Sequence, residues 1–160
     1  MVILRKKLAG ISERSLERFT RRAQHAAGLE GEVNVLVTGT TEIRRLNRRF
    51  RDQDKATDVL SFPSADGLSA GDIAICAEIS AANARRLGHS PSEELQILIL
   101  HGMLHLAGYD HQRDGGEMAR EEQRLRRALS LPVSLIERSR DGTGPAGKVG
   151  ERARHRRRRT

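Results

Sequence analysis

Three of the chain's six histidines lie close together, at His101, His105 and His111. Their spacing is H-x-x-x-H-x-x-G-x-x-H, and positions i and i+4 of a helix lie on the same face. His101 and His105 can therefore aim their imidazoles at one point. Gly108 can take the positive φ that ends a helix, so that the chain turns back and presents His111 to the same point. Three imidazoles with a fourth position left open are typical of a catalytic zinc site, whereas structural zinc sites are closed.

The metal that this ligand set favours is zinc, although imidazole also suits iron, nickel and copper. A zinc ion held in this way lowers the pKa of its bound water to about 7 and polarises a carbonyl or phosphoryl oxygen. The sequence therefore predicts a hydrolase with one Zn²⁺ as cofactor, and it leaves open which bond is cleaved.

The same spacing occurs in metzincin peptidases, in which a glutamate directly follows the first histidine and acts as general base. Here that position is Gly102, and no acid lies between His101 and His105. A metzincin-like peptidase is thus an alternative that lacks its proton shuttle. Asp110 is the acid nearest to the site, and it is a candidate base or hydrogen-bond partner of a ligand histidine. A simple turn-forming role is the other interpretation of Asp110.

A second segment with chemical potential spans residues 47–63 and reads NRRFRDQDKATDVLSFP. Arg49, Arg51 and Lys55 cluster in and before a polar loop that we expect at 51–57. Guanidinium groups bind phosphate oxygens in pairs, and a basic loop beside a metal stabilises the charge of a phosphodiester transition state. Aspartates are interleaved with these cations, so a charge-balanced, solvated loop fits the composition equally well.

The helix expected to carry the first two histidines has the clearest start signal in the chain. Ser90 can be its N-cap, Pro91 its first residue and Glu93 the reciprocal acceptor of a capping box. The residues that follow are apolar around most of the circumference, which predicts a helix buried at the centre of the fold. A packed, rigid helix is what a metal site requires.

The other elements follow from hydrophobic periodicity and from breaker residues. In a short helix that begins at residue 40 or 41, we expect Ile43, Leu46 and Phe50 to face the core. Further helices are expected between Ser12 and Gly28, at 81–87 and from 114 onward, and strands at 32–38, 59–62 and 72–76.

The composition predicts one domain, at residues 1–138, with an aliphatic core, because hydrophobic residues make up 37% of the 160 residues and aromatic residues 2%. The single cysteine excludes an intramolecular disulfide. We find no signal peptide and no apolar stretch long enough for a membrane span, and we expect a cytoplasmic protein without membrane contact. The net charge is +8, of which +6 falls in residues 140–160. Residues 139–160 are expected to form a disordered basic tail that contacts RNA or only aids solubility.

Two motifs together resemble the YbeY family of bacterial endoribonucleases, which are rRNA maturation factors. The segment HGMLHLAGYDH at 101–111 matches the family form H-G-x-L-H-L-x-G-Y-D-H at every fixed position. The segment DKATDVLSFP at 54–63 departs from the family pattern once, because Ala56 stands where proline is usual. The likeness extends over roughly residues 30–130, includes the GDI of residues 71–73, and excludes the arginine-rich C-terminus.

This resemblance implies a single α/β (α+β) domain in which a small mixed β-sheet is flanked by helices. It implies a zinc site on a central buried helix, with His101, His105 and His111 as ligands, and an Arg51 that is important for activity. The implied function is zinc-dependent cleavage of single-stranded RNA in 16S rRNA 3′-end maturation and late ribosome quality control.

The partner that the resemblance implies is the ribosome or its small subunit. A non-catalytic ribosome-associated factor, in which zinc shapes an RNA-binding cleft, is the alternative from a different class. Either water or the RNA's own 2′-OH can be the nucleophile.

Overall fold

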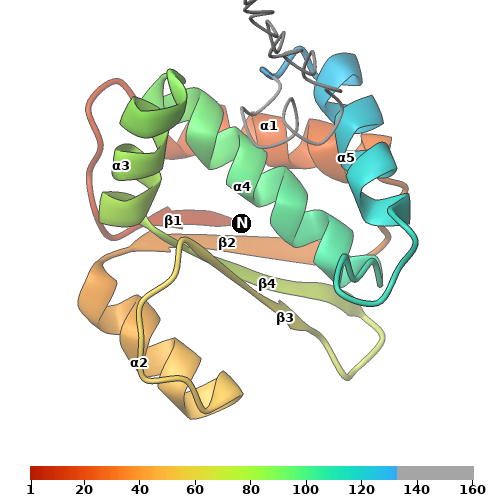
Figure 1. Cartoon of the computed structure of the whole chain (residues 1–160), viewed down its shortest axis with the longest axis horizontal. Coiled ribbons are helices and arrows are strands. Elements are labelled where there is room, and N and C mark those ends of the chain that lie inside the picture. The colour runs from red at the N-terminus through yellow and green to blue at the C-terminus, as the bar shows by residue number, and fades with distance from the viewer. Residues whose placement is uncertain (133–160) are drawn as a thin grey trace, which may run out of the picture.

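The computed structural model describes residues 1–132, which fold around one four-stranded sheet (Figure 1). The strand order is β1-β2-β4-β3; β1, β2 and β4 are parallel, and β3 runs antiparallel to β4 at the edge. The mixed sheet implied by the family resemblance is therefore confirmed. The strands are β1 (Val2–Leu4), β2 (Glu32–Thr38), β3 (Val59–Pro63) and β4 (Ser69–Cys76).

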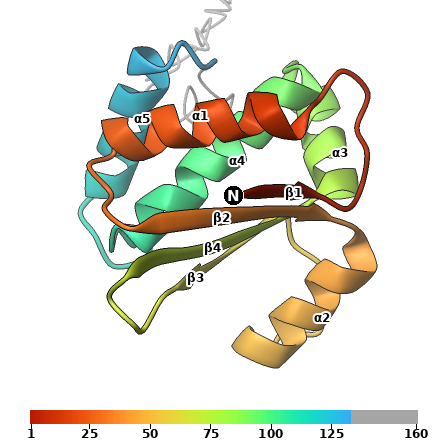
Figure 2. The same cartoon turned by 180° about the vertical axis from the view of Figure 1, so that it is seen from behind.

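Helices cover the two faces of the sheet unequally (Figures 1 and 2). Four of the helices in residues 1–132 lie over one face, and only α2 lies on the other, where it covers one end. The arrangement confirms the expected single α/β domain with flanking helices. The helices are α1 (Glu13–Ala26), α2 (Thr40–Arg51), α3 (Ala77–Leu87), α4 (Pro91–Leu106) and α5 (Glu117–Ala128).

Helix α4 begins as its sequence predicts. The Glu93 amide donates to the Ser90 hydroxyl at 3.1 Å, and the Ser90 amide donates to the Glu93 carboxylate at 2.8 Å. Pro91 occupies the first turn, where the missing N–H leaves no hydrogen bond unmade. These reciprocal bonds fix the residue at which the helix starts. They thereby also fix the face of the helix on which each later side chain lies.

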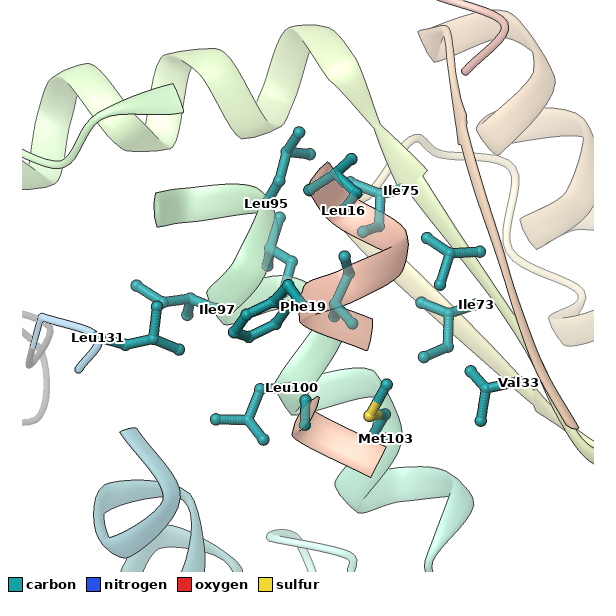
Figure 3. Close-up of a cluster of buried hydrophobic side chains, with 14 of the residues drawn as sticks. Leu16, Phe19, Val33, Ile73, Ile75, Leu95, Ile97, Leu100, Met103 and Leu131 are labelled. Atoms are coloured by element: carbon teal, nitrogen blue, oxygen red, sulfur yellow. The ribbon is translucent and has the colours of Figure 1, made fainter. Parts of the chain in front are cut away.

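The main core lies between α4, α1, α5 and the sheet (Figure 3). It is aliphatic apart from Phe19, as the composition predicts. Each large side chain removed from water contributes about 1.5–3 kcal/mol, so the many buried residues of α4 hold this helix firmly. The side chains labelled in the close-up are Leu16, Phe19, Val33, Ile73, Ile75, Leu95, Ile97, Leu100, Met103 and Leu131.

Helix α2 covers a much smaller cluster on the other face, formed by Ile43, Leu60, Ala74 and Cys76. The inward position expected for Ile43 is confirmed, and Leu46 packs at the margin. The expectation for Phe50 is wrong, because its side chain is 58% exposed. The ring lies beside Phe62 of the edge strand β3, with ring centroids 5.2 Å apart, and this contact leaves most of its surface in water.

Three other details differ from the sequence-based expectations. Strand β1 was not expected; its three residues pair in parallel with β2, and this partner lies more than 30 residues away in the chain. Helix α3 starts at Ala77 rather than residue 81, directly after β4. Arg51 is the last residue of α2 rather than part of the loop, and Asp52 ends the helix in the left-handed conformation.

The predicted domain end at residue 138 and the predicted tail at 139–160 lie outside the described residues. Within residues 1–132, none of the helices has the length and apolar character needed to cross a membrane.

Candidate metal centre

Helix α4 and the turn after it bring the three predicted histidines together. His101 and His105 lie one turn apart near the end of α4, and their Nε2 atoms are 3.1 Å apart. Gly108 has φ +96° and turns the chain away from the helix axis, which places His111 beside them. One ring nitrogen from each histidine lies within 4.8 Å of those of the other two. The structure thus gathers the residues that the spacing selects.

Hydrogen bonds set the orientation of the two helical imidazoles. Nδ1 of His105 lies 3.0 Å from the backbone carbonyl of Tyr109, and Nδ1 of His101 lies 3.0 Å from the Glu122 carboxylate. A carbonyl or carboxylate oxygen only accepts, so each Nδ1 carries the proton. The Nε2 atoms, which face each other, are then the ones left to bind a metal.

The donor set fits zinc on chemical grounds. Neutral imidazole is an ordinary zinc ligand, and tetrahedral bonds of about 2.0–2.1 Å place neighbouring nitrogens about 3.3 Å apart. The 3.1 Å between the Nε2 atoms of His101 and His105 matches this spacing. Burial lowers the pKa of His105, and the nearby charges of His101, His111 and Arg51 lower it further. The hydrogen bond to the Tyr109 carbonyl raises this pKa, but the lowering effects outweigh it. The imidazole is therefore neutral at physiological pH, as a ligand must be.

Glu122 is a functional candidate that the sequence reasoning missed. It lies on α5, is buried, and its Oε1 is the partner of His101. Burial raises the pKa of this carboxyl, but the His101 ring and the Arg126 guanidinium outweigh that effect and leave the pKa below its usual value. Arg126 lies one turn further along α5, with Nη2 3.4 Å from Glu122.

A signal for Glu122 exists in the sequence. It falls within the apolar stripe of α5, between Met118 and Leu125, where an acid is unexpected unless it has a buried partner. From the sequence, Asp110 was the candidate base or histidine partner, or a turn residue, because it is the acid nearest to the histidines along the chain.

Asp110 lies at the rim of the site rather than behind it. Its carboxylate accepts from the Gln112 amide at 3.0 Å and pairs with Arg113 at 3.5 Å, and the side chain is 44% exposed. These contacts agree with the turn-forming interpretation. Asp110 also lines the hollow in front of the histidines, so its expected role as a base stays a prediction.

Arg51, at the end of α2, lines the same hollow although it is far from the histidines in the sequence. This hollow has a volume of about 410 Å³, and Arg51, Ser61, Asp110 and two of the histidines are among its lining residues. The Arg51 guanidinium donates to the Ser61 carbonyl at 3.2 Å. The Ser61 hydroxyl in turn donates to the Gly102 carbonyl of α4 at 3.2 Å. Strand β3 therefore holds Arg51 in register with the helix that carries His101 and His105.

The aspartates interleaved in the basic segment have partners other than Arg51. Asp54 forms a paired contact with Arg44, with the shorter bond at 2.8 Å. Asp58 accepts from the Val59 amide at 2.8 Å and is also bonded by Asn83. Two of the segment's three aspartates thus have partners elsewhere, and Arg51 lines the hollow.

The family profile described as "Endoribonuclease YbeY" matches residues 3–130, which includes every residue of the site described above. The chain belongs to the YbeY endoribonuclease family. The YbeY resemblance first identified from two short motifs thus extends over the whole sheet and all five described helices.

Similar proteins support this assignment. An "Endoribonuclease YbeY" of Koribacter versatilis is 60% identical over 152 residues, which cover 95% of this chain and 98% of that protein. A YbeY protein of Solibacter usitatus is 48% identical over 86% of this chain and 92% of its own length. The solution structure of TM1509 from Thermotoga maritima has a TM-score of 0.57 and 28% identity, and covers 95% of this chain and 100% of its own.

Proposed function

We propose that this protein is a zinc-dependent endoribonuclease that cleaves single-stranded RNA. Membership of the YbeY family supports the reaction class. The observation that carries the proposal is a single hollow lined both by histidines of the cluster and by Arg51. Nitrogen ligands for a Lewis acid and a guanidinium for a phosphate are two groups that stabilise the charge of a phosphodiester transition state.

The protein's own groups have distinct tasks in this proposal. Zinc at the three imidazoles would supply a Lewis acid and a nucleophile at neutral pH. Glu122 and the Tyr109 carbonyl keep the helical rings turned toward the hollow. Arg51 uses one N–H on the Ser61 carbonyl, and its guanidinium has further donors for a phosphate oxygen. Asp110, at the rim, is the proposed proton acceptor.

The peptidase alternative is disfavoured by the packing of Gly102. A Cβ at this position would lie 3.0 Å from the Ile73 side chain and 3.1 Å from the Ser61 hydroxyl. The position after the first histidine therefore faces the sheet at close approach. A glutamate there would be driven into the core and would not reach a substrate, so the helix has no room for the metzincin base.

We also propose the cellular setting that the family resemblance implies. The protein would act in the cytoplasm on the 3′ end of 16S rRNA and in late quality control of ribosomes, with the ribosome or its small subunit as partner. Residues 139–160, predicted as a basic tail, would add salt-dependent affinity for RNA. Deleting residues 140–160 should weaken RNA binding most at low salt and leave cleavage intact.

The experiment that tests the proposed activity pairs metal analysis with two substrates, an unstructured oligoribonucleotide and a denatured protein. We expect stoichiometric zinc, cleavage of the RNA and no proteolysis. Cleavage by protein without stoichiometric metal would contradict the zinc mechanism. A zinc-loaded protein that binds the RNA without cutting it would favour the non-catalytic ribosome-associated factor. A 2′,3′-cyclic phosphate product would exclude simple attack by water.

A pair of arginine variants tests the part played by Arg51. Arg51→Ala should keep its zinc and lose RNA cleavage, because the phosphate loses its guanidinium partner. Arg22→Ala removes the same charge from an exposed position of α1 and should cleave normally. Equal cleavage by the two variants would remove Arg51 from the mechanism.

A further inference from the structure

A second groove lies on the face of the sheet that α2 only partly covers. Figures 1 and 2 show α2 at one end of this face, with no helix of the described chain over the other end. The groove has a volume of about 700 Å³, which is within the range of ligand-binding pockets. Its walls come from β1, β2, β3, β4 and α2, so it is part of the rigid fold.

Two aromatic rings give this groove its chemical character. Phe50 of α2 and Phe62 of β3 both line it, and their ring centroids are 5.2 Å apart. The chain has only three phenylalanines, and two of them are here. Phe50 is 58% exposed, which is a poor position for a ring that only contributes to folding. An exposed ring beside a second ring offers a stacking surface for a planar group.

Polar groups lie beside the rings on the neighbouring strands, where Asp72 is the cross-strand partner of Phe62. Asn34 of β2 donates to Asp72 of β4 at 3.0 Å, and both residues line the groove and remain accessible. An amide and a carboxylate present both donors and acceptors. A base stacked on the rings can use such groups for edge-on hydrogen bonds.

The groove is continuous with the metal hollow through the edge strand. Arg51, Ser61 and Pro63 line both spaces. The Ser61 side chain bonds to α4 on the metal side, whereas its neighbour Phe62 packs toward α2 on the groove side. Among residues 1–132, β3 has no neighbouring strand beyond it, so an extended chain can pass round this edge from one space to the other.

The charge beside the groove suits a polyanion. Helix α2 contains five arginines and one acidic residue, and Arg44, Arg45, Arg48 and Arg49 line a depression together with Asp54. Arg44 pairs with Asp54 and Arg45 with Glu42, so the proposal relies on Arg48 and Arg49 for the contacts with phosphates. The Arg49 guanidinium also lies over the Phe50 ring, 5.2 Å from its centroid. A basic helix next to aromatic rings is the combination that binds single-stranded nucleic acid, since arginines hold phosphates while rings stack on bases.

We propose that this groove is a nucleobase subsite, in which a base flanking the cleaved phosphodiester stacks against Phe50 and Phe62. The inference rests on the proposed endoribonuclease function and extends it. RNA bound in this way runs from the metal hollow past Arg51 and round β3, so one flanking nucleotide is held by its base. A duplex presents no splayed base to the groove, and this gives the protein a physical basis for selecting single strands.

The test measures equilibrium binding and cleavage of a short fluorescent oligoribonucleotide by the full-length, zinc-loaded protein. Phe50→Ala should weaken binding about tenfold, since stacking on one ring has an effect of this order. Its zinc content should not change. Leu68→Ala is the control, because Leu68 is 82% exposed in the β3–β4 turn and does not line the groove. It should bind like the unaltered protein.

A series of oligoribonucleotides, each lacking one base at a different position, identifies the base that stacks on Phe50. At one position near the cleaved bond, loss of the base should weaken binding to the unaltered protein about tenfold. The same abasic RNA should bind Phe50→Ala and the unaltered protein equally, because each change removes one half of the same contact.

Two results would overturn the subsite. Phe50→Ala that binds RNA as tightly as the unaltered protein would show that the groove is not used by RNA and would leave it as a face for a protein partner. A defect that persists with every abasic RNA would show that the ring acts on something other than a base. Failure of the endoribonuclease proposal is distinguishable, because it would appear as zinc-loaded protein that binds RNA but does not cleave it.

Discussion

The two faces of the sheet differ in how completely helices cover them. The histidine cluster belongs to the covered face, and the groove lies on the open one. On one face, α4 is enclosed by α1, α5 and the strands, with Leu95, Ile99, Leu100 and Met103 fully buried. On the other, α2 covers a small cluster and leaves a groove open beside Phe50. The packed face fixes the histidines, and the open face keeps room for substrate. Chemistry that needs fixed distances is thus built on the more completely packed part.

The largest effect on the packed face should come from removing a metal ligand. His105→Ala should lose stoichiometric zinc and reduce RNA cleavage to background, because two imidazoles do not hold the ion in place. Metal analysis and cleavage assays on the same sample measure both losses. His25→Ala, an exposed histidine of α1 outside the cluster, is the control and should retain both. A variant that cleaves RNA at the normal rate would break the link between the packed face and the chemistry.

The stability difference between the two faces should be nearly as clear. Leu100→Ala should lower the free energy of unfolding by about 2–5 kcal/mol, since it leaves a cavity in a closed core. Phe50→Ala should lower it by less than about 1 kcal/mol, because the ring is already largely in water. Urea denaturation monitored by circular dichroism gives both values. Similar losses for the two variants would mean that the open face contributes as much to folding as the packed one.

The role assigned to Glu122 predicts a smaller effect, which is measured as a change in metal affinity. Glu122→Gln should weaken zinc binding about 10–100-fold, the usual consequence of altering the hydrogen-bond partner of a ligand histidine. Competition with a chelator measures the affinity. Glu121→Gln is the matched control, because Glu121 pairs with Arg124 instead. Equal zinc affinity in the two variants would reduce Glu122 to a packing residue.

The smallest expected effect concerns the start of α5, which carries Glu122. Asp114 accepts from the amides of Met118 and Gly116, and these bonds hold the pKa of its carboxyl below the usual 3.8. A lowered carboxyl pKa stabilises the fold above pH 3.8, and that contribution is lost as the pH falls through the lower folded-state value. Asp114→Ala should therefore be less stable at pH 7, with the difference shrinking below pH 3.8. Denaturation of both proteins at pH 7 and at a pH below 3.8 checks this expectation. A stability difference between them that does not change with pH would contradict it.

Local signals predicted most elements correctly, and the exceptions share a cause. Ser90 and Glu93 lie within one helical turn of each other, so the start of α4 follows from neighbours in sequence. Strand β1 was missed because three residues have no pattern of their own until β2 pairs with them. Phe50 was placed inward because helical periodicity gives its side of α2 but not how completely residues of the sheet cover that side.

In the candidate site, too, local sequence predicted some residues and tertiary packing placed the others. The sequence alone determined the histidine cluster, since the helical repeat and a glycine turn bring His101, His105 and His111 together without help from distant residues. Only the tertiary structure decided that Glu122 lies behind His101 and that Arg51 lies in front of the cluster. Those placements depend on how α5 and β3 pack against α4. The residues brought together are 21 to 60 positions apart in sequence, and their placement is fixed by burial of the whole core, which no short stretch of sequence encodes.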